Sequence, residues 1–287
     1  MISNAVLKGG GVLVATEAGA IKALDDAGIR PGIKRIAGAS AGTLIGVSVS
    51  LGLSGQQICD QIMSLDFEKF RDGGDPLRLV EHGKWGYFRN EFVPAWVESL
   101  LTTKLKPKAT FQDLRTLGGP DLYTVATNLD TGKSEIFSAA TSPMVIVSEA
   151  IKASTSIPFF YEAATISGRK ALYVDGGMMK NYPIDIFDDL EPRRNTIGLY
   201  PTQLTLTAID KVQYGNIIDY LLQNFNCLLD AQDEEVKSTD SILAQTALLD
   251  DFGMSYTNFS ITQKEKQRLI TSGYNGMMQK LKELKLV

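Results

Sequence analysis

The pentapeptide Gly38-Ala39-Ser40-Ala41-Gly42 constrains the fold of this chain more than any other feature. It follows a short run at 34–37 that is expected as a strand, and it precedes a stretch typical of a buried helix. A serine flanked by small residues at such a junction is typical of a nucleophile elbow, a turn too tight for larger side chains. Free N–H groups at the start of the helix would stabilise negative charge developing there. The pattern predicts a nucleophile at Ser40, and a tightly packed turn without chemistry is the alternative.

The composition is that of a globular protein with a sizeable core, since 44% of the 287 residues are apolar and 22% are charged. The net charge of −4 offers no general attraction to nucleic acid. Cys59 and Cys227 form neither a disulfide framework nor a metal-ligand spacing. We expect no secretory signal, because the chain opens without a basic region followed by an apolar one. The uncharged stretch 36–53 is interrupted by serines and contains the elbow. We therefore expect a cytoplasmic protein with no nucleic-acid partner, transmembrane segment, metal or cofactor.

Strands alternate with helices along most of the chain, which predicts an α/β fold with a largely parallel or mixed sheet. No repeat or linker divides the chain, so we expect one domain over 1–287, with the core motifs within about 5–200 and a mostly helical part over about 208–287. Strands are expected near 5–7, 34–37, 121–128, 134–137, 162–166, 171–174, 196–200 and 254–259. Helices are expected near 16–27, 41–52, 55–65 and 145–153, with another capped by Asn90 and a last one opened by the capping box of Thr262 and Glu265.

Two glycine-rich segments test a nucleotide-binding function, and both fail. Gly9-Gly10-Gly11 follows a strand, but the dinucleotide fingerprint requires glycine at Val14. Gly132-Lys133-Ser134 looks like the end of a P-loop, but the partner glycine would fall on Thr127. A role for the first loop remains, because its glycines let backbone N–H groups turn toward a ligand. Together with the amide of Ala41, such groups would form an oxyanion hole.

A serine nucleophile needs a base, and the chain offers two candidates. The single histidine, His82, lies in a segment without a motif and would have to recruit a carboxylate from elsewhere. Asp175 ends the strand 171–174 and is followed by Gly176-Gly177, which allow close approach to another backbone. An aspartate acting directly on a serine hydroxyl is a two-member form of nucleophile activation. A simple Asp-Gly-Gly turn is the alternative at Asp175.

The segment 67–96 has irregular patterning and is rich in aromatic residues. It could form a lid or an acyl-chain pocket exposed at a lipid interface. The alternative, which the pattern slightly favours, is ordinary core packing under a long connection. The aromatic residues are Phe67, Phe70, Trp85, Tyr87, Phe88, Phe92 and Trp96.

Ordered motifs along nearly the whole chain resemble those of the patatin-like phospholipases. They correspond to the family's glycine-rich block and first helix, its nucleophile block, its middle strand, the stretch before its base and its Asp-Gly-Gly block. In this order the segments are Lys8-Gly9-Gly10-Gly11 with 18–29, Gly38-Ala39-Ser40-Ala41-Gly42-Thr43, Ala126-Thr127-Asn128 with Thr131-Gly132, Ala153-Ser154-Thr155-Ser156-Ile157-Pro158, and Tyr173-Val174-Asp175-Gly176-Gly177 with Asn181-Tyr182-Pro183.

The resemblance implies a three-layer patatin-like fold and a dyad without histidine, in which Ser40 is the nucleophile and Asp175 the base. It implies a phospholipase A-type serine esterase that hydrolyses phospholipid or other acyl-ester lipids through an acyl-enzyme. It implies that neither metal nor cofactor takes part and that the protein can contact a membrane surface transiently. The implied oxyanion donors are Gly10, Gly11 and the Ala41 amide, and the supporting glycines are Gly9, Gly38, Gly42, Gly176 and Gly177.

The chain departs from the family pattern directly after the triple glycine. The family usually continues with any residue, then Arg or Lys, then Gly, where this chain has Val12, Leu13 and Val14. The missing cation removes a contact to phosphate or carboxylate, and the missing glycine stiffens the loop. A weakly active or inactive member that binds lipid or a protein partner is therefore the alternative function.

Overall fold

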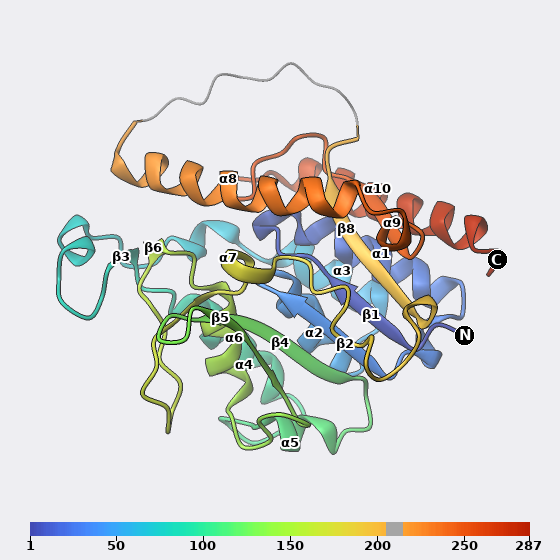
Figure 1. Cartoon of the computed structure of the whole chain (residues 1–287), viewed down its shortest axis with the longest axis horizontal. Helices are drawn as coiled ribbons and strands as arrows, with labels where there is room; N and C mark the ends of the chain where they lie inside the picture. Colours follow the sequence, from blue (N-terminus) through green and yellow to red (C-terminus); the bar gives the residue numbers. More distant parts are fainter. Residues whose placement is uncertain (205–214) are drawn as a thin grey trace.

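The computed structural model describes residues 1–204 and 215–287. In this part of the chain a seven-stranded sheet has the order β5-β4-β2-β1-β8-β9, with β7 also paired to β4 (Figure 1). Pairs among β4, β2, β1, β8 and β9 are parallel, whereas β5 and β7 run antiparallel to β4. The predicted mixed, mostly parallel sheet is confirmed. Its strands are β1 (Asn4–Leu7), β2 (Arg35–Ala39), β4 (Asp121–Asn128), β5 (Lys133–Ser138), β7 (Tyr173–Asp175), β8 (Thr196–Thr202) and β9 (Thr246–Asp250).

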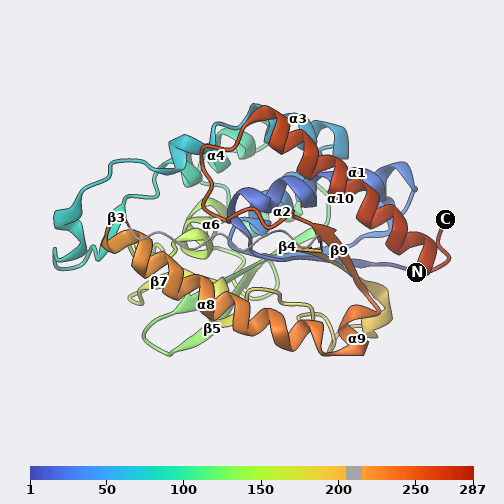
Figure 2. The ribbon, with the colours of Figure 1, turned by 90° about the horizontal axis from the view of Figure 1, so that it is seen from above.

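Helices cover both faces of the sheet (Figure 2). Successive strand residues point to opposite faces, so each face has its own core. Ala5 and Leu7 of β1 belong to the larger core, while Val6 between them belongs to the smaller one. The three-layer architecture is thereby confirmed. On one side lie α1 (Val14–Asp26), α2 (Gly42–Ser50), α3 (Gly55–Ser64) and α10 (Gln263–Glu283), and on the other lie α8 (Ile217–Lys237) and α9 (Asp240–Leu243).

Several local predictions are also confirmed. The predicted capping box of Thr262 and Glu265 opens α10, and the structure shows a further capping box, with Ser54, at the N-terminus of α3. Every residue of α2 is buried, as expected for a central helix directly after the elbow. None of the described helices combines the length and the apolar composition needed to cross a bilayer. The expected start of the helical part near 208 lies outside the described residues.

Two predicted strands are wrong. The alternating stretch 162–166 makes only the single bridge of Ala164 to Tyr173. Its alternation reflects the burial of Ala164 and Ile166 rather than strand pairing. The strand expected near 254–259 is irregular, and the actual edge strand is β9. The central residues of β9, Ala-Leu-Leu, favour a helix by intrinsic propensity, but parallel pairing with β8 overrides that preference.

The connection over 66–91 contains structure that the sequence pattern does not reveal. A short strand, β3 (Gly86–Phe88), pairs in parallel with β6 (Phe159–Tyr161) in a separate two-stranded sheet. The first helix after it, α4 (Phe92–Leu101), leads on to α5 (Phe111–Arg115) and α6 (Val147–Thr155).

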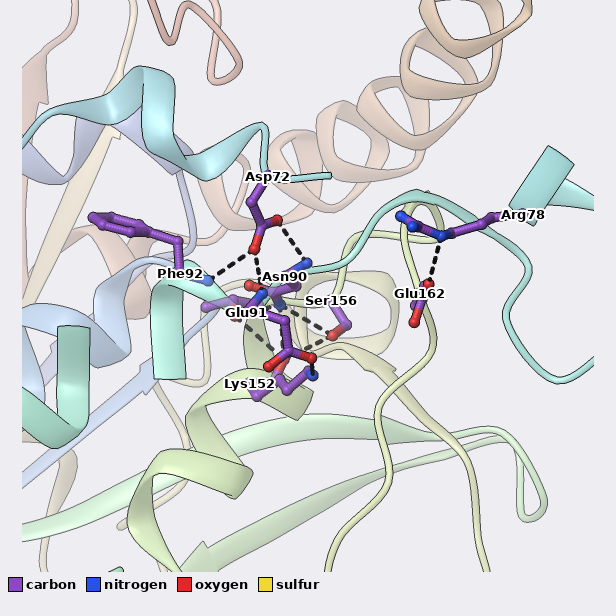
Figure 3. Close-up of polar contacts among 9 residues, drawn as sticks. Asp72, Arg78, Asn90, Glu91, Phe92, Lys152, Ser156 and Glu162 are labelled. Atoms are coloured by element: carbon purple, nitrogen blue, oxygen red, sulfur yellow. Dashed lines mark hydrogen bonds and ion pairs between the residues drawn. The ribbon is translucent and has the colours of Figure 1, made fainter. Parts of the chain in front are cut away.

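Asn90 is not the N-cap of α4, contrary to the prediction. The carboxylate of Asp72 accepts the N–H groups of Asn90, Glu91 and Phe92 at 2.9, 2.6 and 2.9 Å, and so satisfies the helix start from a distant residue (Figure 3). Asn90 itself adopts a left-handed conformation with φ +56° and directs its side chain to the end of α6.

The two helices α1 and α10 cross at glycines. A Cβ atom on Gly19 would overlap the carbonyl of Ile270, and one on Gly273 would overlap the carbonyl of Thr16. Both obstacles are helix backbone, which cannot rotate away as a side chain can. The crossing therefore depends on the absence of side chains at these two positions.

Gly273→Ala is expected to lower the free energy of unfolding by about 1–3 kcal/mol, because the added methyl forces the two helices apart. Urea denaturation measures the change. Thr271→Ala, at an exposed position of the same helix, serves as the control and should stay within about 0.5 kcal/mol of the parent. Equal stability of the Gly273 variant and the control would contradict the close crossing.

Candidate active site

Strand β4 brings Ser40 and Asp175 together along one edge. Strand β2 pairs with its first half and ends with Ala39 opposite Val125. Strand β7 pairs antiparallel with its second half and ends with Asp175 opposite Ala126. The two strands thus approach each other head to head along β4. As a result Ser40 Oγ donates a hydrogen bond to Asp175 Oδ2 at 2.6 Å, across 135 positions of sequence.

The backbone at Ser40 is strained in the manner expected of an elbow. Its φ is +48°, in the left-handed region that non-glycine residues rarely adopt. The small neighbours permit the sharp turn: a Cβ on Gly38 would lie 2.8 Å from the carbonyl carbon of Gly42, and one on Gly42 would lie 2.9 Å from the carbonyl oxygen of Lys8. The turn places Ser40 directly before the N-terminus of α2.

The end of α6 supports both residues of the pair. Ser154 Oγ accepts the N–H of Ser40 at 2.9 Å and donates to the carbonyl of Val125 at 2.6 Å. The carbonyl of Ser156 accepts the N–H of Asp175 at 2.8 Å. One short segment therefore fixes the backbone of Ser40 and that of Asp175 at the same time.

The Asp175 carboxylate is almost completely buried, with 1% of its surface exposed. Its Oδ1 accepts the N–H of Gly177 at 2.7 Å, while Oδ2 accepts the Ser40 hydroxyl. Burial raises the pKa of Asp175 from its ordinary 3.8 to about 7, and the two hydrogen bonds offset only part of this rise. Gly176 is required here because a Cβ would overlap the carbonyl of Val125.

Asn181 holds the glycine loop against the pair. Its carbonyl accepts the N–H of Gly9 at 3.0 Å, and its side-chain amide donates to the Gly9 carbonyl at 3.2 Å. A Cβ on Gly9 would overlap Asn181 Oδ1 and would lie 3.0 Å from Ser40 Cβ. The loop can approach the serine this closely only with glycine at position 9.

Three backbone N–H groups near the serine are free. In the described part of the chain, the amides of Gly10, Gly11 and Ala41 have no hydrogen-bond acceptor. Gly10 precedes a short 3-10 helix and Gly11 is its first residue, while Ala41 precedes α2; N–H groups at such helix starts lack intrahelical partners. Such groups are the donors that an oxyanion requires.

A narrow cavity of about 20 Å³ lies at the serine, enough for about one water molecule. The glycine loop, Ser40 and Asp175 line it from the sheet side. Four residues of α8 (Leu222, Phe225, Asn226 and Leu229) cover it, together with Tyr256 and Thr257. Helix α8 thus covers the cavity on the side that faces away from the sheet.

Polar contacts hold α8 in this position. Lys8, which is 1% exposed, forms a buried ion pair with Asp233 at 2.5 Å and donates to the carbonyl of Pro201. Gln232 accepts the N–H of Asn181 at 2.9 Å and donates to the carbonyl of Gly177 at 2.8 Å. The cover is therefore bonded directly to the residues that follow Asp175 and to the residue that precedes the glycine loop.

The structure does not bring His82 to this site. It is exposed on the 76–86 connection, where its ring lies against that of Trp85 with centroids 5.6 Å apart. Leu13 and Val14 are buried in the core at the start of α1, so a cation at position 13 would also be buried. Among the described residues, no three His, Cys, Asp or Glu side chains are placed to hold a metal ion.

The predicted site residues leave out four side chains that the structure places around the pair. Ser154 and Asn181 lie within the motifs quoted above, but the sequence does not indicate which groups their side chains bind by hydrogen bonds. Thr127 Oγ1 donates to the Asp175 carbonyl at 2.9 Å from the neighbouring strand. Gln232 lies on an ordinary amphipathic helix, and no sequence signal distinguishes it.

The chain is similar in sequence to known proteins. The chain is 28% identical to the uncharacterized protein YqhO of Bacillus subtilis over 293 residues, covering 95% of this chain and 96% of that protein. It is 25% identical to the probable lipid hydrolase 463L of Invertebrate iridescent virus 6 over 170 residues, covering 57% and 56% of the two chains.

Solved structures share the fold at low sequence identity. VipD from Legionella pneumophila superposes with a TM-score of 0.72 and 18% identity, over 98% of this chain and 67% of VipD. Human GIVD cytosolic phospholipase A2 superposes with a TM-score of 0.55 and 11% identity, over 99% and 59%. A sequence model described as patatin-like phospholipase matches residues 5–188, a range that contains the glycine loop, Ser40 and Asp175. The chain belongs to the patatin-like phospholipase family.

Proposed function

We propose that the protein is a lipid acyl hydrolase of the phospholipase A type, with Ser40 as nucleophile and Asp175 as general base. The observation that carries the proposal is the 2.6 Å hydrogen bond from Ser40 Oγ to the buried Asp175 carboxylate. It lies beside free N–H groups at the start of a helix, and both residues fall within the range matched by the family.

In the proposed acylation, Asp175 first accepts a proton and later donates it again. Asp175 takes the hydroxyl proton as Ser40 Oγ forms a bond to the ester carbonyl carbon. The amides of Gly10, Gly11 and Ala41 stabilise the resulting oxyanion. The bond from this carbon to the leaving oxygen then breaks, and Asp175 returns the proton to the departing alcohol.

The proposed deacylation repeats these transfers with water. Asp175 takes a proton from a water molecule that attacks the acyl-enzyme carbonyl, and the same amides stabilise the second oxyanion. The ester bond to Ser40 breaks, Ser40 Oγ recovers the proton, and a fatty acid leaves. No side chain outside the dyad is needed for a proton transfer.

A member that binds lipid without hydrolysing it is the alternative function. The covered cavity favours it, because an ester group does not fit within about 20 Å³ and the substrate must displace part of the cover. A small fluorophosphonate that reacts with activated serines distinguishes the two functions. Covalent labelling at Ser40 supports the hydrolase, and absence of labelling supports the binding protein.

Ser40→Ala and Asp175→Asn are expected to abolish hydrolysis of a short-chain p-nitrophenyl ester, by at least about 1,000-fold and 100-fold in kcat/KM. The first variant removes the nucleophile, and the second keeps the shape but removes the proton acceptor. His82→Ala is the control and should stay within about twofold, because His82 is exposed outside the cavity. An inactive His82 variant beside a nearly normal Asp175 variant would rule out the proposed mechanism.

The rate is expected to depend on pH through Asp175. A base must be ionised, and with a pKa of about 7 its ionised fraction grows almost tenfold per pH unit at low pH. For an uncharged ester, kcat/KM should rise in this way from pH 5, reach half its maximum near pH 7 and level off above pH 8. A half-maximum near pH 4 would show that the carboxylate is not desolvated.

Asp175→Asn is also expected to stabilise the fold, increasingly at higher pH. Because the folded-state pKa exceeds the ordinary value, the folded protein binds more protons than the unfolded chain between about pH 4 and 7, and its stability falls over that range. Asparagine carries no such penalty. The stability gain over the parent, from urea unfolding, should be larger at pH 8 than at pH 5 by about 2–3 kcal/mol, at about 1.36 kcal/mol per pKa unit. A gain independent of pH would contradict this.

A further inference from the structure

A groove of about 550 Å³ lies next to the catalytic cavity. It runs between the segment 71–88, β6 and the first turns of α8. Strand β3 of that segment lies near the start of α8 in both views of the chain (Figures 1 and 2). Its volume falls within the range of about 300–1,000 Å³ that is usual for small-molecule sites. Its apolar walls consist mainly of Tyr87, Phe88, Phe160, Phe259, Ile218 and Leu222.

The groove begins where the catalytic cavity ends. Leu222 of α8 and Thr257 line both spaces, so the groove and the site of Ser40 share part of their walls. A ligand whose carbonyl lies at Ser40 can extend into the groove once Leu222 and Thr257 give way. The cover over the serine and the entrance to the groove are therefore the same residues.

The walls suit an apolar chain rather than a polar group. Phe88 packs on Phe160 with ring centroids 4.7 Å apart, and Phe160 stacks on Phe259 at 5.6 Å. These rings form one continuous apolar surface along the groove.

The two charged residues along the groove are both engaged. Arg71 contacts Glu68 at 3.3 Å and lies over the ring of Phe259. Asp219 accepts the N–H groups of Gly215 and Asn216 at the start of α8, at 2.9 and 3.2 Å. Neither charge is left to select a polar ligand, so the groove recognises its ligand by apolar contact.

The outer wall of the groove is held in place by the network of Figure 3. Besides the bonds of Asp72 to the start of α4, the buried Asn90 donates to Thr155 Oγ1 and Ser156 Oγ, both at 3.2 Å. Arg78, which is almost completely buried, pairs with Glu162 at 3.3 Å. The wall is therefore anchored at both ends of the segment rather than loose.

The same network links the groove to the proposed dyad. Ser156, to which Asn90 is bonded, accepts the backbone N–H of Asp175. The aromatic wall and the carboxylate are thus attached to one short stretch at the end of α6. A ligand in the groove is held in a fixed relation to the reacting groups.

Exposed apolar side chains occur on both banks of the groove. Leu77 and Val80 on the segment 71–88 are 71% and 82% exposed, and Trp85 follows on the same segment. Ile217 and Tyr220 of α8 are 57% and 52% exposed. Large apolar groups exposed together mark a surface that meets apolar material. Exposed apolar side chains on both banks therefore offer a lipid chain an apolar approach to the groove.

We propose that this groove binds one long fatty-acyl chain of the substrate ester. The inference rests on the hydrolase proposed above and makes it specific for long-chain acyl lipids. Each methylene that moves from water into the groove should raise kcat/KM by up to about fourfold, which corresponds to about 0.8 kcal/mol. The chain length that is preferred should end where the groove ends.

Kinetics with a series of p-nitrophenyl esters, kept below their critical micelle concentrations, tests the proposal. In the parent protein kcat/KM should rise more than tenfold from the butanoate to the decanoate. Ile218→Trp fills the groove beside Leu222 and should reduce the decanoate-to-butanoate ratio at least tenfold. Pro76→Trp, at an exposed position on the groove, narrows it with little risk to folding and should reduce the ratio in the same direction.

Leu228→Trp is the matched control, since it makes the same change on the exposed face of α8 and should leave the ratio unchanged. A parent ratio near one, or parental ratios in both groove variants, would overturn the proposal while leaving the hydrolase intact. Loss of all ester hydrolysis and of labelling at Ser40 would instead reject the proposed function.

A binding measurement tests the groove without turnover. The Ser40→Ala protein is titrated with cis-parinaric acid, a fluorescent long-chain fatty acid, and the bound acid is then displaced with palmitate. Adding Ile218→Trp should raise the Kd at least tenfold, and adding Leu228→Trp should not change it. Equal Kd values in the two double variants would contradict an acyl site at this place.

Discussion

The structure of the candidate site depends on two strands that share one edge of β4. Strand β2 covers the edge up to Val125, and β7 covers it from Ala126 in the opposite direction. Because the sheet ladder fixes both registers, the residues at the two strand ends must meet, and these are Ser40 and Asp175. The hydrogen bond between them follows from backbone pairing rather than from any flexible side-chain arrangement. A change of register in either strand would separate the pair.

Burial of this pair has a consequence for stability. A desolvated carboxylate is unfavourable, and the surrounding hydrogen bonds from Ser40 and Gly177 compensate it only in part. Helix α8 and the end of α6 maintain the dry environment through the Lys8–Asp233 pair, Gln232 and Ser154. Residues far apart in sequence thus stabilise a strained turn and an isolated acid. Such local strain is common where a protein carries out chemistry.

Much of this could be predicted from the sequence, because the elbow and the Asp-Gly-Gly turn are dictated by local sterics. Neighbouring backbone atoms exclude a side chain at Gly38 and at Gly176. Such a steric requirement restricts the residue types allowed at a position, so it can be recognised as a motif in the sequence. The pairing of β9 could not be predicted, because its composition favours a helix and only the neighbouring strand decides. The role of Asp72 at the start of α4 could not be predicted either. The N–H groups that it accepts lie 18–20 residues away, and the sequence around a loop carboxylate does not indicate which group it will bind.

The ion pair of Lys8 and Asp233 has a further meaning for the order in which the chain is made. The two residues are 225 positions apart, and the lysine directly follows β1, the first strand that leaves the ribosome. Until the aspartate has been synthesised, the amine has no counter-ion, and its burial beneath the glycine loop is unfavourable. A nascent chain therefore cannot complete this pocket early.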